Sequence, residues 1–256
     1  MKLFFRREGE GKPLVILHGL FGLSDNWMSF ARMLASGFSV YVPDLRNHGR
    51  SAHSSVFDFY CMEDDLLEFL EDQHLPNIIL MGHSLGGKIS MNFALRHPGM
   101  VQKLIVVDIS PRKYTSRKEH QNLIDAMQAV DFSVAKSRTD VDRQLSEHLA
   151  DIKLRQFLMK NVYWRNRTVL DWRLNLKSIN ENLPAVSEGI DISGTYTGPA
   201  LFIRGGLSSY IRDADVNGIK EKFPGAELVT IANASHWVQA DAPGEFHEIV
   251  RKFLDK

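Results

Sequence analysis

Short, nearly continuous runs of apolar residues recur in the first 110 positions and again after position 195, and each run ends in a polar or glycine-bearing loop. Runs of this kind are typical of strands that are buried on both faces of a sheet. A less regular stretch over residues 2–8 is a candidate first strand. The clearer runs cover residues 12–17, 38–42, 77–81, 101–107, 199–206 and 226–231.

Segments with helical spacing separate the predicted strands. In residues 60–73, apolar side chains fall on one side of the helix and acidic side chains on the other. Ser24 or Asp25 is expected to cap the first helix, and Asp241 the last one. This alternation predicts an α/β fold with a mostly parallel sheet flanked by helices. Besides a helix directly after position 84, the predicted helices cover residues 27–34, 60–73, 213–223 and 243–254.

The alternation fails between positions 111 and 194. Amphipathic helices are expected there without any paired strand, and an aromatic and charged stretch with Tyr163, Trp164 and Trp172 lies among them. We therefore predict one domain whose core comprises residues 1–110 and 195–256, with a helical cap inserted over residues 111–194. The expected helices of the insert run from Arg117 to Val130, from Asp140 to Ala150, from Ile152 to Val162 and from Ile179 to Gly189.

Composition and charge exclude several classes of function. Lysine plus arginine and aspartate plus glutamate number 31 each, so the charge gives no argument for a nucleic acid or an anionic membrane as partner. Cys61 is the single cysteine, which excludes an intrachain disulfide and favours a packing role. No secretory signal core and no run of membrane-spanning length occur. We expect a cytoplasmic protein.

One short motif gives this frame a chemical function. Residues 81–87 read MGHSLGG, a G-x-S-x-G stretch placed between a predicted strand and a predicted helix. In that context the chain turns sharply and holds the serine side chain out at the turn, while Gly82 and Gly86 let strand and helix approach each other. The motif predicts that Ser84 is a nucleophile.

A serine nucleophile needs a base within hydrogen-bond reach and an acid behind that base. In open α/β sheets, reactive groups gather at the carboxyl ends of the strands, so only residues directly after strands are good candidates. His18 precedes the glycine-bearing loop and is expected to bond the backbone, His48 follows an earlier strand and is expected to be structural, and His83 lies beside the predicted nucleophile. His236 follows the last strand and fits the chain order that this motif requires, so we predict it as the base.

Two aspartates compete for the acid. The loop after the strand ending near position 204 contains no carboxylate, and Asp213 comes later, inside a predicted helix. Asp108 ends the strand that follows Ser84 and lies 24 positions beyond it (108 − 84), enough for one helix and one strand. We predict Asp108 as the acid and keep Asp213 in reserve.

Ester chemistry also requires two backbone N–H groups for the oxyanion, one of them from the residue after the nucleophile. Leu85 is that residue. The loop after the strand over residues 12–17 supplies the second N–H, from Leu20 or, as the alternative, from Phe21. Its glycines, Gly19 and Gly22, allow a close approach of the backbone.

Five stretches together resemble the α/β-hydrolase superfamily and, more narrowly, the YbfF-type esterases. The resemblance runs almost from end to end, and the Arg-Asn-His-Gly loop and the Asp-Ile-x-Pro stretch are its more specific parts. The matching stretches are HGLFG (residues 18–22), DLRNHGRS (44–51), GHSLGGK (82–88), DISP (108–111) and SHWV (235–238).

The resemblance implies a small serine esterase with thioesterase activity and a helical cap. It also implies a triad acid directly after the strand that follows the helix of the nucleophile, which again is Asp108. Leu207 and Ser209 stand where these esterases carry Asn and Pro, a difference that bears on substrate shape. If the insert forms the acyl pocket, its apolar residues are the first candidates, and the alternative is that they pack the cap: Phe157, Leu158, Met159, Trp164 and Trp172.

The predicted reaction is the hydrolysis of small to medium acyl esters or thioesters through an acyl-enzyme on Ser84. It needs no metal and no organic cofactor, and the protein is expected to act as a monomer or homodimer. A serine at this position argues against dehalogenase and epoxide hydrolase chemistry, which use a carboxylate nucleophile on this fold. Two alternatives stay open: a ligand-binding receptor that keeps the triad, and cleavage of carbon–carbon bonds or perhydrolysis by the same triad.

Overall fold

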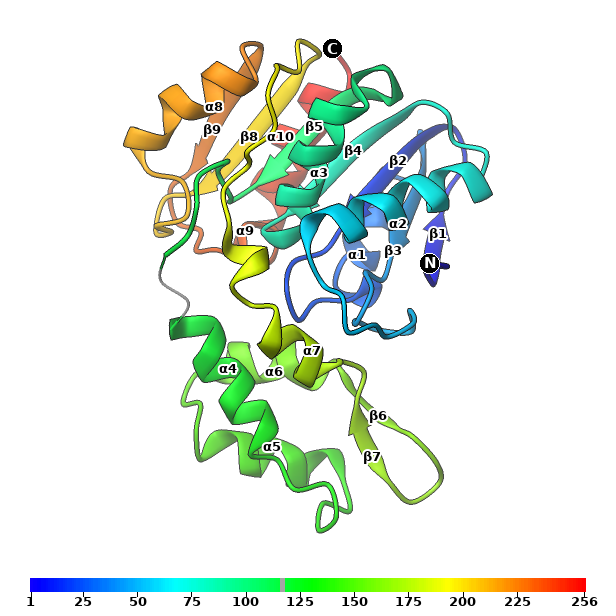
Figure 1. Cartoon of the computed structure of the whole chain (residues 1–256), viewed down its shortest axis with the longest axis vertical. Coiled ribbons are helices and arrows are strands. Elements are labelled where there is room, and N and C mark those ends of the chain that lie inside the picture. Colours follow the sequence, from blue (N-terminus) through cyan, green and yellow to red (C-terminus); the bar gives the residue numbers. More distant parts are fainter. Residues whose placement is uncertain (116–117) are drawn as a thin grey trace.

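The computed structural model describes residues 1–115 and 118–256, and its main feature is a seven-stranded sheet (Figure 1). The strands follow the order β1-β3-β2-β4-β5-β8-β9, and all neighbours are parallel except β1 and β3. This arrangement confirms the predicted fold class. The strands are β1 Phe5–Glu8, β2 Lys12–Leu17, β3 Phe38–Pro43, β4 Ile78–His83, β5 Val101–Val107, β8 Ala200–Gly205 and β9 Ala226–Ile231.

Helices cover both faces of this sheet. The apolar sides of α1 and α10 pack on one face, and those of α2, α3 and α8 pack on the other. In α10, Phe246, Val250 and Phe253 are buried, and burial of each such side chain contributes roughly 1.5–3 kcal/mol before entropy is counted. The helices are α1 Met28–Leu34, α2 Phe59–Asp72, α3 Leu85–Arg96, α8 Val216–Lys222, α9 Val238–Asp241 and α10 Pro243–Leu254.

The predicted helix caps were wrong. Asp241 belongs to α9, where its carboxylate accepts a hydrogen bond from the Ser235 N–H at 2.9 Å, and α10 instead begins at Pro243, whose fixed φ suits a first helical position. Ser24 opens a 3₁₀ turn before α1 and donates its backbone N–H to Asp44 Oδ1 at 2.6 Å. No side-chain bond caps α1 in the described residues. Contacts with other parts of the chain have taken these polar groups away from the helix ends.

The described residues of the predicted insert, 111–194, form four α-helices and also a hairpin that was not predicted. Strands β6 (Val162–Trp164) and β7 (Leu170–Trp172) pair antiparallel, and Asn166 Oδ1 closes their turn by accepting the N–H of Val169 at 2.9 Å. Figure 1 shows these elements grouped on one side of the sheet. The helices are α4 Lys118–Gln128, α5 Arg138–Ser146, α6 Ile152–Met159 and α7 Leu176–Glu181.

Two expected helix positions in the insert need comment. The predicted start at Arg117 lies outside the described residues. The helix expected from Ile179 to Gly189 was wrong in its bounds, because α7 begins three residues earlier, where Asn175 caps it, and ends before Pro184. A separate 3₁₀ turn over Ala185–Ser187 takes up the remainder.

Three further features concern the molecule away from the sheet edge: the single cysteine, possible metal ligands and possible membrane spans. The Cys61 thiol lies half-buried near the start of α2, and burial raises its pKa to about 11, so it is a poor nucleophile at neutral pH. Within residues 1–115 and 118–256, no cluster of metal-ligating side chains occurs. Over the same ranges, every helix is too short or too polar to cross a membrane.

Candidate active site

Ser84 occupies a strained turn between β4 and α3. Its φ of 53° and ψ of −117° place a non-glycine residue in a region that costs on the order of 1–3 kcal/mol. The turn depends on the two neighbouring glycines. A Cβ on Gly82 would lie 2.2 Å from the Gly86 carbonyl oxygen, and one on Gly86 would lie 2.3 Å from the Leu17 carbonyl oxygen. Strand and helix can therefore meet this closely only without side chains at these positions.

The structure brings Asp108 and His236 together at the same edge of the sheet. Asp108 directly follows β5 and is fully buried, and its Oδ2 lies 2.8 Å from His236 Nδ1. Its Oδ1 accepts the Gly205 N–H at 3.0 Å, and the Ser208 hydroxyl donates to Oδ2. Three donors from two neighbouring loops thus hold one buried carboxylate, which keeps its oxygens directed at the imidazole.

His236 is held through its backbone carbonyl and through aromatic contacts of its ring. Its carbonyl oxygen lies 2.8 Å from His83 Nε2, and its ring stacks on Tyr210 at a centroid distance of 3.8 Å and an angle of 18°. The His83 ring lies 4.8 Å away, and burial lowers the pKa of His83 to about 3, so it stays neutral. In the part of the chain described, Ser84 makes no hydrogen bond to His236. In free enzymes such contacts often tighten only when substrate binds.

Asp213 lies elsewhere. It begins a 3₁₀ turn, its side chain is 92 % exposed, and its carboxylate pairs with Arg204 Nη1 at 2.6 Å. The geometry therefore places Asp108, and not Asp213, against the imidazole of His236.

The loop after β2 lies against the nucleophile. A Cβ on Gly19 would come within 3.2 Å of Ser84 Cβ, so the backbone of this loop lies close to the turn that holds Ser84. The Phe21 N–H already donates to His48 Nε2 at 3.2 Å, whereas the Leu20 N–H has no partner among residues 1–115 and 118–256. Leu85 is the first residue of α3, so its N–H lacks a partner one turn earlier in the helix.

His18 bonds the backbone, as the sequence predicted, and His48 does so as well. His18 Nε2 accepts the Leu45 N–H at 3.0 Å, and His48 Nδ1 lies 2.8 Å from the Arg46 carbonyl oxygen. Burial lowers the pKa of His18 to about 4 and that of His48 to about 3. Both imidazoles are therefore neutral at physiological pH and can act as acceptors.

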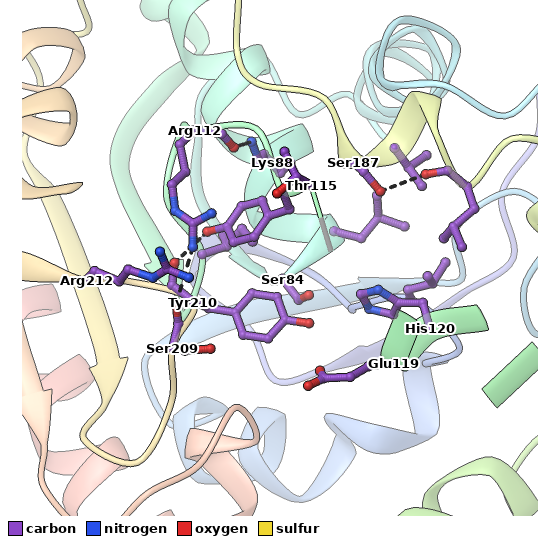
Figure 2. A pocket seen from close by; sticks show the side chains of 16 residues that line it. Ser84, Lys88, Arg112, Thr115, Glu119, His120, Ser187, Ser209, Tyr210 and Arg212 are labelled. Atoms are coloured by element: carbon purple, nitrogen blue, oxygen red, sulfur yellow. Dashed lines mark hydrogen bonds between the residues drawn. The ribbon is translucent and has the colours of Figure 1, made fainter. Parts of the chain in front are cut away.

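A cavity of about 190 Å³ opens above Ser84 (Figure 2). Leu20 and Leu85 line it beside the serine, and in the view of Figure 2 Ser84 lies between Tyr210 and His120. Glu119 and His120 come from α4, and Leu183 and Val186 come from the end of the insert. The predicted insert therefore contributes part of the wall of this cavity beside Ser84.

The apolar residues that were candidates for this pocket do not line it. Leu158, Met159 and Trp172 are buried inside the insert, where the Trp172 indole N–H donates to the Met127 carbonyl oxygen at 3.0 Å. Trp164 is half exposed on the hairpin, and Phe157 contacts Trp237 at a ring distance of 5.8 Å. Leu158, Met159 and Trp172 therefore pack within the insert, and Phe157 packs it against Trp237 of the core.

Comparison with known proteins shows which family the chain belongs to. The sequence model for the α/β-hydrolase fold matches residues 12–243. The chain belongs to the α/β-hydrolase family. It is 38 % identical over 256 residues to a zebrafish (Danio rerio) sn-1-specific diacylglycerol lipase, ABHD11, covering 98 % of this chain and 80 % of the lipase. It is also 31 % identical over 250 residues to the esterase YbfF of Escherichia coli, covering 98 % of this chain and 96 % of YbfF.

A solved structure of this α/β-hydrolase type is also similar. A marine microorganism esterase superimposes with a TM-score of 0.96 at 44 % sequence identity, covering 98 % of this chain and 99 % of the other. The resemblance to the superfamily and to YbfF-type esterases is thereby confirmed, as is the expectation of an enzyme, a hydrolase that acts on esters.

The sequence analysis did not predict several residues that contact Asp108 and His236. Ser208 and Tyr210 follow β8, where the sequence offers no carboxylate. The Ser208 hydroxyl nevertheless bonds Asp108, and the Tyr210 ring stacks on His236. Tyr114 supports Tyr210 by donating its hydroxyl to the Tyr210 carbonyl oxygen at 2.6 Å. The position of Ser208 at a strand end was a usable signal. Nothing in the sequence near Tyr114 indicated its contact.

Proposed function

We propose that this α/β-hydrolase is a serine carboxylesterase or thioesterase that hydrolyses small to medium acyl esters through an acyl-enzyme on Ser84. The observation that carries the proposal is the 2.8 Å contact between Asp108 Oδ2 and His236 Nδ1, at the sheet edge where the Ser84 turn opens into a pocket. The names of the relatives, an esterase and a lipase, support the choice of ester substrates.

Acylation begins with His236 as general base. Its Nε2 takes the proton from Ser84 Oγ while the oxygen attacks the ester carbonyl, and Asp108 stabilises the imidazolium that forms. The N–H groups of Leu20 and Leu85 donate to the carbonyl oxygen as it becomes negative. The imidazolium then protonates the leaving alcohol or thiol, and the carbon–oxygen or carbon–sulfur bond breaks.

Deacylation repeats these steps with water. Water enters the position of the departed group, His236 removes its proton, and the resulting tetrahedral intermediate uses the same two N–H groups. Collapse of the intermediate returns the proton to Ser84 Oγ and releases the carboxylic acid. The residues named here supply every proton transfer, so the scheme includes no cofactor.

The insert is proposed to act as a cap. Glu119, His120, Leu183 and Val186 cover the pocket from the side opposite the sheet, so the insert selects which acyl groups reach the serine. We also propose that the protein is cytoplasmic and acts as a monomer or homodimer. The half-buried single cysteine is compatible with a reducing compartment.

Labelling with a fluorophosphonate probe and turnover of p-nitrophenyl butyrate test the proposal. The wild type should be labelled and should turn over the ester, and Ser84→Ala should lose labelling and lower kcat by roughly four or more orders of magnitude. Ser146→Ala, an exposed serine of the insert, should retain both. A wild type that is labelled but inert toward an acyl-chain series of esters and thioesters would favour a receptor, and absence of both signals would refute the enzyme.

A further inference from the structure

The turn Gly19–Gly22, which holds the proposed oxyanion donor Leu20, contains an unusual residue. The Gly22 N–H donates to the Gly19 carbonyl oxygen at 2.9 Å, and Phe21, the third residue of the turn, has a φ of 62°. This is the arrangement of a type II turn, in which glycine or asparagine normally occupies the third position. A phenylalanine there costs on the order of 1–3 kcal/mol unless its surroundings hold it.

Two side chains from distant parts of the chain bond this peptide on both sides. His48, in the loop after β3, accepts the Phe21 N–H on Nε2 at 3.2 Å. Asn161, between α6 and β6, donates its Nδ2 to the Phe21 carbonyl oxygen at 2.8 Å. His48 and Asn161 have no measurable exposure to solvent, so neither bond competes with water.

The partners of each side chain fix its orientation. His48 Nδ1 lies 2.8 Å from the Arg46 carbonyl oxygen, which places the proton on Nδ1 and leaves Nε2 as acceptor. Asn161 Nδ2 also faces the Leu158 carbonyl oxygen at 3.3 Å, so its donor end is directed at two carbonyls. Asn161 Oδ1 is buried and has no partner in the described ranges. The Asn161 amide therefore acts only as a hydrogen-bond donor here, and its oxygen accepts no bond from the described residues.

We propose that His48 and Asn161 are positioning residues that hold Phe21 in its left-handed conformation and thereby direct the Leu20 N–H at the oxyanion. The inference rests on the proposed function. Because Asn161 belongs to the insert, it makes catalysis depend on how the insert is seated over the core. The bond to His48 also removes the Phe21 N–H from the choice of oxyanion donor, which leaves Leu20.

A donor that is only misdirected affects the transition state more than the bound substrate. Asn161→Ala and His48→Leu should therefore lower kcat roughly ten- to a hundredfold, less than the loss of a whole donor, and leave KM within about twofold. The inhibition constant of a trifluoromethyl ketone, whose adduct with Ser84 carries an oxyanion, should rise by a similar factor. His48→Gln, which restores an acceptor, should recover part of kcat.

Asn182→Ala is the matched control. Asn182 also lies in the insert and donates its amide to a core carbonyl, that of Ser55 at 3.1 Å, but it does not touch the turn. It should leave kcat and the inhibition constant unchanged. Thermal unfolding of each variant checks that it is folded. If Asn161→Ala fails to fold, the comparison of His48→Leu with His48→Gln decides.

Three outcomes separate the possibilities. Loss of kcat together with weaker ketone binding at unchanged KM supports the inference. Full kcat in the variants of His48 and Asn161, or a raised KM with unchanged kcat, overturns it while leaving the proposed esterase intact. A wild type without hydrolysis or labelling overturns the proposed function itself, so the two failures are distinguishable.

Discussion

Asp108 shows how a charged side chain is kept inside a hydrolase core. Its two oxygens accept hydrogen bonds from the Gly205 N–H, the Ser208 hydroxyl and His236 Nδ1. A buried carboxylate without such donors would lose several kcal/mol of solvation, by order of magnitude. The same donors leave the carboxylate little freedom to turn, which suits a group that must orient an imidazole.

Replacing this acid tests its assignment. Asp108→Asn presents an amide N–H₂ or an oxygen at the same place, which favours the wrong imidazole tautomer, so kcat for p-nitrophenyl butyrate should fall by roughly three to four orders of magnitude with a similar KM. Asp213→Asn should lose only an exposed pair with Arg204 and keep nearly full activity. Steady-state kinetics of both variants decide, and the reverse pattern would transfer the role to Asp213.

Residues of the site could be predicted where they directly follow strands. Ser84 was chosen from its G-x-S-x-G motif, and Asp108 and His236 were chosen for their positions after strands; the structure puts the last two in contact. Asn161 could not be found in this way. Its bond to Phe21 spans 140 positions and depends on how the insert folds onto the core, which no local pattern encodes.

Packing between helices also buries one carboxyl group without hydrogen-bond partners in the described chain. Glu63 of α2 is buried against α3, and neither oxygen has a hydrogen-bond partner within the described chain. Arg96 Nη1 and His97 Nε2 lie 3.7 and 3.6 Å from Oε1. Burial raises the pKa of Glu63 from its ordinary 4.5 to about 7, and the charge of Arg96 only partly opposes the effect.

The raised pKa gives a pH dependence of stability. Folded Glu63 keeps its proton up to about pH 7, whereas the unfolded carboxyl ionises near 4.5, so the folded state loses stability as pH rises between these values. Glu63→Gln does not titrate. Relative to the wild type it should therefore gain roughly 1–2 kcal/mol of unfolding free energy between pH 5 and pH 8. Urea denaturation at both values measures this, with exposed Glu71→Gln as control, and a pH-independent difference would contradict it.

Element prediction succeeded where burial imposes a period. Helix α10 was predicted over residues 243–254 and has these bounds, because its apolar stripe faces the sheet and Pro243 marks its start. The hairpin of β6 and β7 was missed because each strand has three residues, too few for alternation to be visible. Helix α7 begins and ends earlier than predicted because Asn175 caps its start and Pro184 closely follows its end.

At the scale of the whole molecule, Lys88 joins the core to the insert. It lies one turn after Ser84 in α3 and is 2 % exposed. Its Nζ donates to the carbonyl oxygens of Pro111 and Glu188, both at 3.0 Å, and of Arg112 at 2.5 Å. These carbonyls belong to the two connections through which the chain enters and leaves the insert. The Lys88 side chain, whose pKa burial lowers to about 7, therefore ties both connections to the helix that follows Ser84.

Removal of the Lys88 amino group should weaken the attachment of the insert to the core. Lys88→Met keeps much of the side-chain volume but leaves three carbonyls without their donor, so the free energy of unfolding should fall by roughly 2–3 kcal/mol. Thermolysin should also cleave the two connections faster. The exposed Lys153→Met should change neither quantity. Unchanged stability and cleavage in Lys88→Met would show that the packing of the insert does not need the bond.

Neighbouring strand ends supply both the carboxylate of Asp108 and the hydroxyl of Ser208 that bonds it, because β5 and β8 lie side by side in the sheet. A carboxylate in the place of the Ser208 hydroxyl would therefore lie beside Asp108. A chain with carboxylates at both ends would place two like charges around one imidazole and would raise the pKa of one of them. Once protonated, that carboxyl could donate a hydrogen bond as the Ser208 hydroxyl does.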